Sequence, residues 1–217
     1  MLEDVSFEWK EQHWRLSAGR AVYWEEEQTL ILADLHAGKS AHFRKAGIAV
    51  PANIVQEDLY RLQQLITKYC PVRVIVVGDM FHSSANNDVQ YFRIWRQQFP
   101  HIHFMLITGN HDILEPAMYD DLRISLQDTL SLRNIFFVHD AADTPETLKD
   151  QYVLSGHIHP GVRLVGYGKQ SLRLPCFYFG PDAAVLPAFS HFTGTYSLEP
   201  EPASAVFVIA EKKVFRV

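Results

Sequence analysis

The sequence is poor in cysteine, has no long apolar run and carries no excess of basic residues. Its two cysteines, Cys70 and Cys176, are far apart and form no Cys-x-x-Cys pair, which argues against a thiolate zinc site and favours a reducing compartment. No apolar stretch approaches the roughly 20 residues that a membrane-spanning helix needs. The first residues lack the basic start and apolar run of a signal peptide. We therefore expect a cytoplasmic protein with no membrane contact.

The net charge of -5 argues against a protein that coats nucleic acid non-specifically, since such proteins carry a clear basic excess. It does not exclude an enzyme that touches a few phosphates, because local charge can differ from net charge. With 217 residues, of which 47% are hydrophobic, the chain is long enough for one domain with a sizeable core. We therefore predict a single domain over residues 1–217, without internal repeats.

The apolar pattern predicts several strands buried on both faces, separated by helices in the first half of the chain. Helical spacing is predicted from Ile54 to Ile66 and from about Asn87 to Phe99. The tail from Val162 onward is rich in strand-like segments. This order indicates either one mixed sheet or two packed sheets with helices outside. The predicted buried strands are Thr29–Ala33, Val72–Val77, His103–Ile107, Ile135–Val138 and Tyr152–Leu154.

What the sequence does contain is histidine, aspartate and asparagine in short clusters, each directly after a predicted buried strand. Most of the 11 histidines belong to these clusters. Polar residues just past the carboxyl ends of strands are where ligands bind in open α/β sheets. In chain order the clusters are Asp34-Leu35-His36, Gly78-Asp79-Met80-Phe81-His82, Gly109-Asn110-His111-Asp112, His139-Asp140 and Gly156-His157-Ile158-His159.

These residue types indicate metal binding, since carboxylates and imidazoles together suit Zn, Mn or Fe. Side chains alternate between the two faces of a strand, so both polar side chains of Asp-x-His or His-x-His could lie on the same face of the sheet. The glycines at 78, 109 and 156 would permit turns or close backbone approach. The candidate ligands are too many for one tetrahedral ion, and suit two ions about 3.5–4 Å apart. They are Asp34, His36, Asp79, Asn110, His139, His157 and His159.

The alternative for each cluster alone is a structural or surface role. A single Asp-x-His pair is common and usually structural, whereas Gly-Asn-His-Asp is rare by chance. The recurrence of all five clusters in order leaves little room for coincidence. Of the histidines outside these clusters, we interpret four as surface or satisfied buried imidazoles: His13, His101, His103 and His191.

Taken in order, the motifs Asp-x-His, Gly-Asp-x-x-His, Gly-Asn-His-Asp, a lone His and Gly-His-x-His resemble those of the calcineurin-like metallophosphoesterase superfamily. They span Asp34 to His159, and the similarity in layout covers nearly the whole chain. The resemblance implies an α/β fold of the four-layer α+β type. In that fold, two mixed β-sheets pack face to face and are flanked by helices.

The resemblance also implies a role for each residue of the clusters. Three residues would bind one ion, one would bridge both ions, and three would bind the second ion. His111 would contact the phosphate and protonate the leaving group, with Asp112 orienting it, since a carboxylate beside an imidazole fixes its tautomer and raises its pKa. The ligands implied for the first ion are Asp34, His36 and His159, and Asp79 is the implied bridge. The ligands implied for the second ion are Asn110, His139 and His157.

A narrower resemblance is to the ligase-associated branch, whose members are commonly named DNA-damage-response endonucleases or phosphoesterases. It is carried by His36-Ala37-Gly38-Lys39, by His42-Phe43-Arg44-Lys45-Ala46-Gly47-Ile48 and by Gly78-Asp79-Met80-Phe81-His82-Ser83. It implies a functional link to a DNA ligase. Candidate substrate contacts are His82, Lys39 and Arg44. For the two cations the alternative is a solvated loop face. For His82 the alternatives are a metal ligand or a residue that supports a ligand.

We therefore predict a binuclear metal-dependent phosphoesterase, a phosphodiesterase or nuclease acting on DNA in repair, in which a metal-bridging hydroxide attacks phosphorus. Two divalent transition metal ions are expected, with Mn as first choice and Fe or Zn as alternatives. One rival is a hydrolase of a small phosphorylated metabolite or nucleotide, which the acidic net charge favours. Another is a non-catalytic binding module, which would be expected to lack some of the ligands. The sequence leaves the oligomeric state open.

Overall fold

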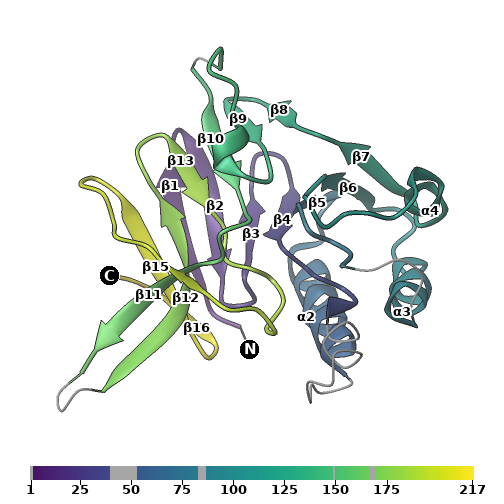
Figure 1. Cartoon of the computed structure of the whole chain (residues 1–217), viewed down its shortest axis with the longest axis horizontal. Coiled ribbons are helices and arrows are strands. Elements are labelled where there is room, and N and C mark those ends of the chain that lie inside the picture. The colour runs from purple at the N-terminus through teal and green to yellow at the C-terminus, as the bar shows by residue number, and fades with distance from the viewer. Residues whose placement is uncertain (1, 40–52, 83–86, 149, 167–169) are drawn as a thin grey trace.

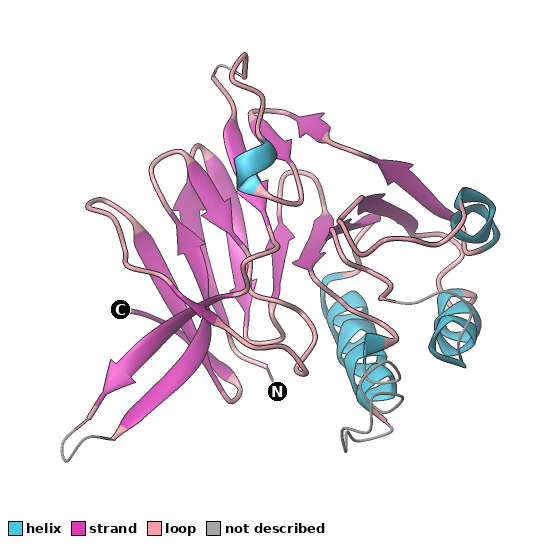
Figure 2. Cartoon of the chain, in the orientation of Figure 1, coloured by secondary structure: helices cyan, strands magenta, loops and turns pink. Residues whose placement is uncertain are grey.

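The computed structural model describes residues 2–39, 53–82, 87–148, 150–166 and 170–217, and the strands among them form two mixed β-sheets. The two sheets lie face to face, and the longer helices cover the outer side of the first sheet (Figures 1 and 2). The fold class implied by the sequence motifs is therefore confirmed.

The first sheet has seven strands in chain order, β1 to β7. Its first four strands are antiparallel neighbours, joined by short turns that contain left-handed residues such as Lys10, Glu11 and Arg20. From β4 onward the strands are parallel, so each connection must cross over, and helices fill those crossovers. The strands are β1 (Asp4–Trp9), β2 (Gln12–Ser17), β3 (Ala21–Trp24), β4 (Thr29–Ala33), β5 (Arg73–Val77), β6 (His103–Ile107) and β7 (Ile124–Gln127).

The second sheet has nine strands, seven of them in the order β14-β11-β12-β13-β10-β9-β8, while β15 pairs with β12 and with β16. Strand β10 is parallel to both neighbours, β9 and β13, and most of the other pairs are antiparallel. The strands are β8 (Leu130–Leu132), β9 (Ile135–Phe137), β10 (Tyr152–Ser155), β11 (Pro160–Val165), β12 (Ser171–Phe179), β13 (Ala183–Val185), β14 (Tyr196–Ser197), β15 (Ala205–Ala210) and β16 (Lys213–Arg216).

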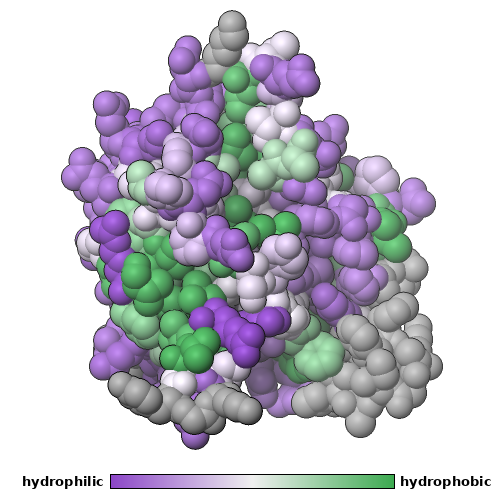
Figure 3. All heavy atoms as spheres, turned by 60° about the vertical axis from the view of Figure 1, so that its left-hand side comes forward, coloured by the Kyte–Doolittle hydropathy of each residue, from purple (hydrophilic) through white to green (hydrophobic). Residues whose placement is uncertain are grey.

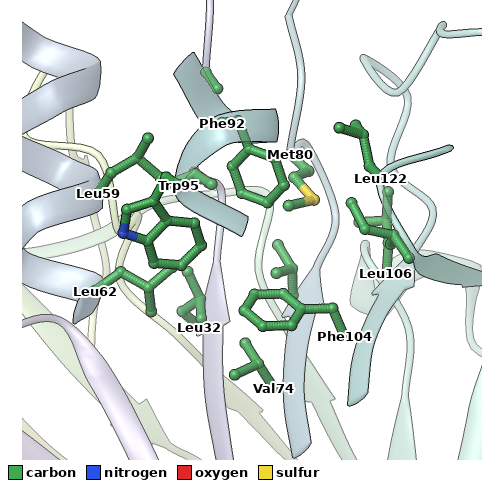
Figure 4. Close-up of a cluster of buried hydrophobic side chains, with 14 of the residues drawn as sticks. Leu32, Leu59, Leu62, Val74, Met80, Phe92, Trp95, Phe104, Leu106 and Leu122 are labelled. Carbon is green, nitrogen blue, oxygen red and sulfur yellow. The ribbon is translucent and has the colours of Figure 1, made fainter. Parts of the chain in front are cut away.

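The described helices are α2 (Ile54–Tyr69), α3 (Asn87–Arg96), α4 (Pro116–Asp121) and a 3₁₀ turn, η1 (Ala141–Asp143). Figure 4 shows how Leu59 and Leu62 of α2 and Trp95 of α3 lie over Leu32 and Val74 of the sheet. This apolar layer holds the helices on the outer face of the first sheet. None of the described helices combines the length and apolar character that crossing a bilayer requires.

A second apolar layer joins the two sheets, and strand alternation explains why the central strands are buried throughout. In β4, Leu30 and Leu32 face the helices, whereas Ile31 and Ala33 face the second sheet. The second sheet contributes large side chains to the same layer, among them Phe137. A strand covered on both faces reads as an unbroken apolar run, which is the pattern seen in the sequence.

Most of the predicted elements are confirmed, and the differences lie at short elements. The structure has β6 at the predicted bounds and α2 close to them, while α3 ends at Arg96 rather than near Phe99. Helix α4 and the short strands β7, β8, β13 and β14 did not follow from the pattern. Helix α4 has fewer than two turns and these strands have two to four residues, so they contain too few repeats for a period to show.

Candidate metal centre

The carboxyl ends of β4, β5 and β6 meet at one edge of the first sheet, and the loops that follow them approach the loops after β9 and β10. The loops are tied by backbone hydrogen bonds. The His36 N–H donates to the Asp79 carbonyl at 2.8 Å, and the Gly156 N–H donates to the His139 carbonyl at 3.0 Å. The five sequence clusters therefore face one another across this edge.

Most of the candidate ligands have a left-handed backbone, with φ between 47° and 67°. This conformation is uncommon for residues with a side chain and is concentrated at functional sites. The sequence interpretation relied on strand alternation to turn both members of Asp-x-His to one face. The structure corrects that reason, because these residues lie beyond the strand ends, and reversals of the backbone direct their side chains. They are Asp34, His36, Asp79, His157 and His159.

Three of the candidate ligands form a first group. The Nε2 atoms of His36 and His159 are 3.2 Å apart, and His159 Nε2 lies 3.6 Å from Asp34 Oδ1. Asp34 is fully buried and His36 is almost so. Ligating atoms of all three residues lie within 4.8 Å of one another, which is close enough to hold one ion.

A second group converges on the Nε2 atom of His139. Asn110 Oδ1 lies 3.2 Å from it, His157 Nδ1 lies 3.1 Å from it, and Asp79 Oδ1 lies 3.4 Å from it. Two imidazole nitrogens, an amide oxygen and a carboxylate oxygen are a donor set that suits Mn, Fe or Zn.

The two buried carboxylates lie between these groups. Asp79 has Oδ1 beside His139, and its Oδ2 is 4.0 Å from His36 Nδ1. Asp34 meets His36 and His159 in one cluster and meets Asp79 and His139 in another. The buried Asp34 Oδ1 has no hydrogen-bond partner among the described residues. A buried carboxylate oxygen without a hydrogen bond is costly, and a divalent cation would satisfy it, so the residues fit a metal centre.

The glycines of the motifs stand where a side chain would strike a candidate ligand. A Cβ on Gly109 would overlap the Asp79 carboxylate, and a Cβ on Gly156 would lie 2.8 Å from Asp34 Oδ2. The interpretation of these glycines as points of close backbone approach is confirmed at both positions.

Burial sets the charge of the His36 imidazole. Burial, followed by the nearby Lys39 ammonium, lowers the pKa of His36 to about 2. The ring is therefore neutral at ordinary pH, and a neutral imidazole is the form that binds metal. Burial also lowers the pKa of Lys39, while the carboxylates of Asp34 and Asp79 act in the opposite direction.

His111 and Asp112 directly follow Asn110, but the two residues make different contacts. The His111 N–H donates to Asp79 Oδ1 at 3.1 Å, and its exposed ring lies 4.4 Å from the ring of His82. Asp112 is expected to orient the His111 ring. Its carboxylate, however, accepts hydrogen bonds from three backbone N–H groups, and among the described residues no hydrogen bond joins it to that ring.

The donors to Asp112 come from two of the loops. Oδ1 accepts from Met80 at 2.8 Å and from Phe81 at 3.1 Å, while Oδ2 accepts from Gly109 at 2.9 Å. Burial raises the pKa of Asp112 to about 6, against the effect of these N–H donors. Asp112 thus joins the loop that carries Asp79 to the loop that carries Asn110.

The candidate substrate contacts are only partly described. His82 lies beside His111 and 5.7 Å, ring to ring, from His36, so it belongs to this centre. Lys39 is half-buried next to the first group. Arg44 lies outside the described residues.

Asp140 is a residue of the site that sequence reasoning did not assign. Its Oδ2 lies 3.6 Å from Nε2 of His157, the ring atom opposite the one that faces His139. Its position directly after a candidate ligand was the only signal in the sequence. Its partner lies on a different loop, so spacing could not reveal the contact. By contrast, His13 pairs with Glu26 and His103 with Ser125, in keeping with their interpretation as ordinary side chains.

The fold and this cluster define a metallophosphoesterase. The family model described as calcineurin-like phosphoesterase matches residues 28–159, more than half of the chain, and the protein belongs to that family. It is therefore a metal-dependent phosphoric ester hydrolase, and its family implies divalent metal ions, which its Asp and His groups could bind.

Among solved structures, the chain is similar to the nuclease MPE of Pseudomonas putida, with 28% identity, a TM-score of 0.83, and coverage of 99% of this chain and 100% of that one. Weaker similarities include the phosphoesterase Yfce of E. coli, with 12% identity, a TM-score of 0.44, and 87% and 97% coverage. AQ665 of Aquifex aeolicus matches with 16% identity, a TM-score of 0.43, and 60% and 78% coverage. No curated protein matches the sequence.

Proposed function

We propose that the protein is a binuclear metal-dependent phosphodiesterase that cleaves nucleic acid, with DNA as the first choice of substrate. The observation that carries the proposal is the convergence of ligating atoms in two groups on either side of Asp79. Similarity over nearly the whole chain to a protein described as a nuclease supports the choice of a nucleic-acid diester.

In this proposal Asp34, His36 and His159 hold one ion, and Asn110, His139 and His157 hold the other, with Asp79 shared. Two such ions, when bound, lower the pKa of water and neutralise the charge of a phosphoryl group. Mn is our first choice, with Fe and Zn as alternatives, because all three accept imidazole and carboxylate ligands.

The chain's own residues then position the substrate and move a proton. The His111 backbone is fixed by its N–H bond to Asp79, so its exposed imidazole stands at the mouth of the centre beside His82. From there the His111 ring would donate a proton to the departing oxygen of the phosphodiester, as a general acid. Lys39, close to Asp34 and Asp79, would place a positive charge beside the bound phosphate.

The resemblance to the ligase-associated branch extends the proposal to a role in DNA repair, with a functional link to a DNA ligase in the cytoplasm. A substrate panel tests the chemical part. Manganese-loaded protein should cleave bis(p-nitrophenyl) phosphate and single-stranded DNA, and His111→Gln should lower turnover with little change in metal content.

The same panel should include p-nitrophenyl phosphate, 3′-phosphorylated ends, cyclic nucleotides and nucleotide pyrophosphates. Turnover of a small phosphoester in preference to every polynucleotide would favour the metabolite hydrolase instead. Failure on all of these substrates, with two ions bound and the fold intact, would favour a non-catalytic binding module.

A further inference from the structure

Strands β11 and β12 form a two-stranded arm that begins directly after His159 and extends away from the rest of the second sheet (Figure 1, lower left). The strands are antiparallel, and their register places Arg163 directly opposite Arg173. The side of the molecule that carries the arm has both apolar and strongly hydrophilic side chains at its surface (Figure 3). Both arginines are exposed.

Two like charges opposite each other in an antiparallel pair are destabilising. Among the described residues, no carboxylate forms an ion pair with either guanidinium, so the structure does not neutralise the pair itself. A phosphate group would do so, since each guanidinium presents a planar fork of N–H donors that matches phosphate oxygens.

The arm is connected to the candidate metal centre through the segment before β14. Arg173 Nη1 donates to the Thr195 carbonyl at 3.2 Å, and the next residue, Tyr196, donates its N–H to the His159 carbonyl at 2.9 Å. Strand β11 rises about 3.3 Å per residue, so Arg163 lies roughly 13 Å along the chain direction from His159. The positive charge of the arm thus starts roughly 13 Å from the first ligand group, measured along β11.

Lys39 adds a further positive charge next to the first ligand group. It lines a small cavity together with Phe192, Thr193 and Gly194, the residues just before Thr195. We call Lys39, Arg173 and Arg163 the cationic track.

The opposite side of the centre has the opposite charge. A cavity beside the second ligand group is lined by Asn110 and His157 and by three carboxylates, Asp128, Asp140 and Asp143. Neighbouring phosphates of a bound strand would be repelled there and attracted to the cationic track. The charge distribution therefore favours binding of a nucleic-acid strand on the side of the centre that carries the cationic track.

We infer that the cationic track binds the phosphate backbone of a nucleic-acid strand whose scissile phosphate lies at the metal centre. The substrate class is then a polynucleotide with several phosphates, rather than a small phosphoester. This inference rests on the proposed function and specifies the substrate of the same site.

The test compares Arg163→Gln/Arg173→Gln with a control that removes the same charge elsewhere, Lys10→Gln/Arg123→Gln, at the β1–β2 turn and before β7. Binding of a fluorescein-labelled oligothymidylate to the manganese-loaded protein is followed by anisotropy across a salt series. The arm variant should bind about tenfold more weakly, and the slope of log affinity against log salt should fall by about 1 to 1.5, near 0.7 for each phosphate contact on a single strand. The control should change neither quantity by a comparable amount.

Cleavage assays distinguish a role of the arm in substrate binding from a role in the chemistry at the metal centre. The arm variant should hydrolyse bis(p-nitrophenyl) phosphate and a thymidine dinucleotide at the parent rate, but show a raised KM for the oligothymidylate. Equal oligothymidylate affinity in the arm variant and the parent, or an equal loss in the control, overturns the inference. If the parent binds the oligothymidylate through the arm but cleaves no diester, the proposed function fails while the binding surface stands.

Discussion

Gly78 lies against the imidazole of His139, and a Cβ at position 78 would overlap the Nδ1 edge of that ring. Gly78 also has φ of +73°, a conformation that residues with a side chain rarely adopt. This single glycine lets the loop after β5 pass directly beneath a candidate ligand that follows β9. It therefore sets how closely the two sheets approach each other at the metal centre.

Gly78→Ala should destabilise the protein and disturb the second ligand group. We expect a loss of about 2–4 kcal/mol in the free energy of unfolding, from steric overlap and left-handed strain together. Urea denaturation measures the loss, and elemental analysis measures the metal. Gly194→Ala is the matched control, because a Cβ there would meet nothing within 4 Å. Wild-type stability and metal content in Gly78→Ala would contradict this account of the loop.

Asp79→Asn should lower the bound metal from near two equivalents to one or fewer, because the substitution removes the charge that the two ligand groups share. Activity should fall by at least about 100-fold, because mutation of residues that only support a ligand already lowers metal affinity or activity by about 10–100-fold. The fold should persist, because an asparagine oxygen can still accept the His111 N–H. Elemental analysis and circular dichroism check both points, with Asp143→Asn as a charge-matched control. Two equivalents of metal in Asp79→Asn would show that Asp79 is not a shared ligand.

Asp140→Ala should weaken metal binding without removing a ligand. Its carboxylate lies 3.6 Å from His157 Nε2, so it favours the tautomer that carries a proton there and leaves Nδ1 free. Loss of such support typically costs 10–100-fold in metal affinity or activity. A manganese titration measures the change, and Asp140→Asn should recover part of it. Asp143→Ala, in the same cavity, should have no comparable effect. Equal affinities for Asp140→Ala and the parent would remove Asp140 from the site.

Arg61→Met should destabilise the fold and loosen the Asp34 loop. The buried Arg61 guanidinium bonds Asp58 at 2.8 Å and also the Phe189 carbonyl, while the Phe189 N–H donates to Ala33. Removing one partner of a buried pair leaves the other charge uncompensated, at a cost of about 3–5 kcal/mol. Thermal and urea unfolding measure this.

The control for Arg61 is Arg15→Met, which breaks the exposed ion pair with Glu25 and should cost less than about 1 kcal/mol. Similar losses for both variants would mean that burial of the Arg61–Asp58 pair contributes nothing special. A selective loss of metal affinity in Arg61→Met would further link helix α2 to the first ligand group.

The sequence was most informative where a residue type and its position carried the same message. An apolar run such as Val72–Val77, followed at once by Gly78 and Asp79, predicted both a buried strand and a ligand at its end. The family resemblance then supplied the two-sheet fold. The residue pattern alone had left one sheet or two sheets open.

Contacts between distant loops could not be predicted from spacing. Asp112 directly follows His111, so the sequence favoured a bond between neighbours, whereas the carboxylate accepts N–H groups from a loop some 30 positions earlier. The pairing of Asp140 with His157 and the opposition of Arg163 and Arg173 likewise depend on loop direction and strand register. A period in the sequence reports which face a side chain takes, but not which distant residue it meets.

The hydrogen bonds that Asp112 accepts from Met80, Phe81 and Gly109 have a consequence for how the enzyme is assembled. Two of the ligand-bearing loops are fastened to each other by protein groups alone, so their spacing does not depend on cations arriving during folding. We therefore expect the protein to stay folded when a chelator removes its ions, and to bind ions again afterwards. The ion that it carries would then follow the supply in the surrounding solution rather than be set at the moment of synthesis.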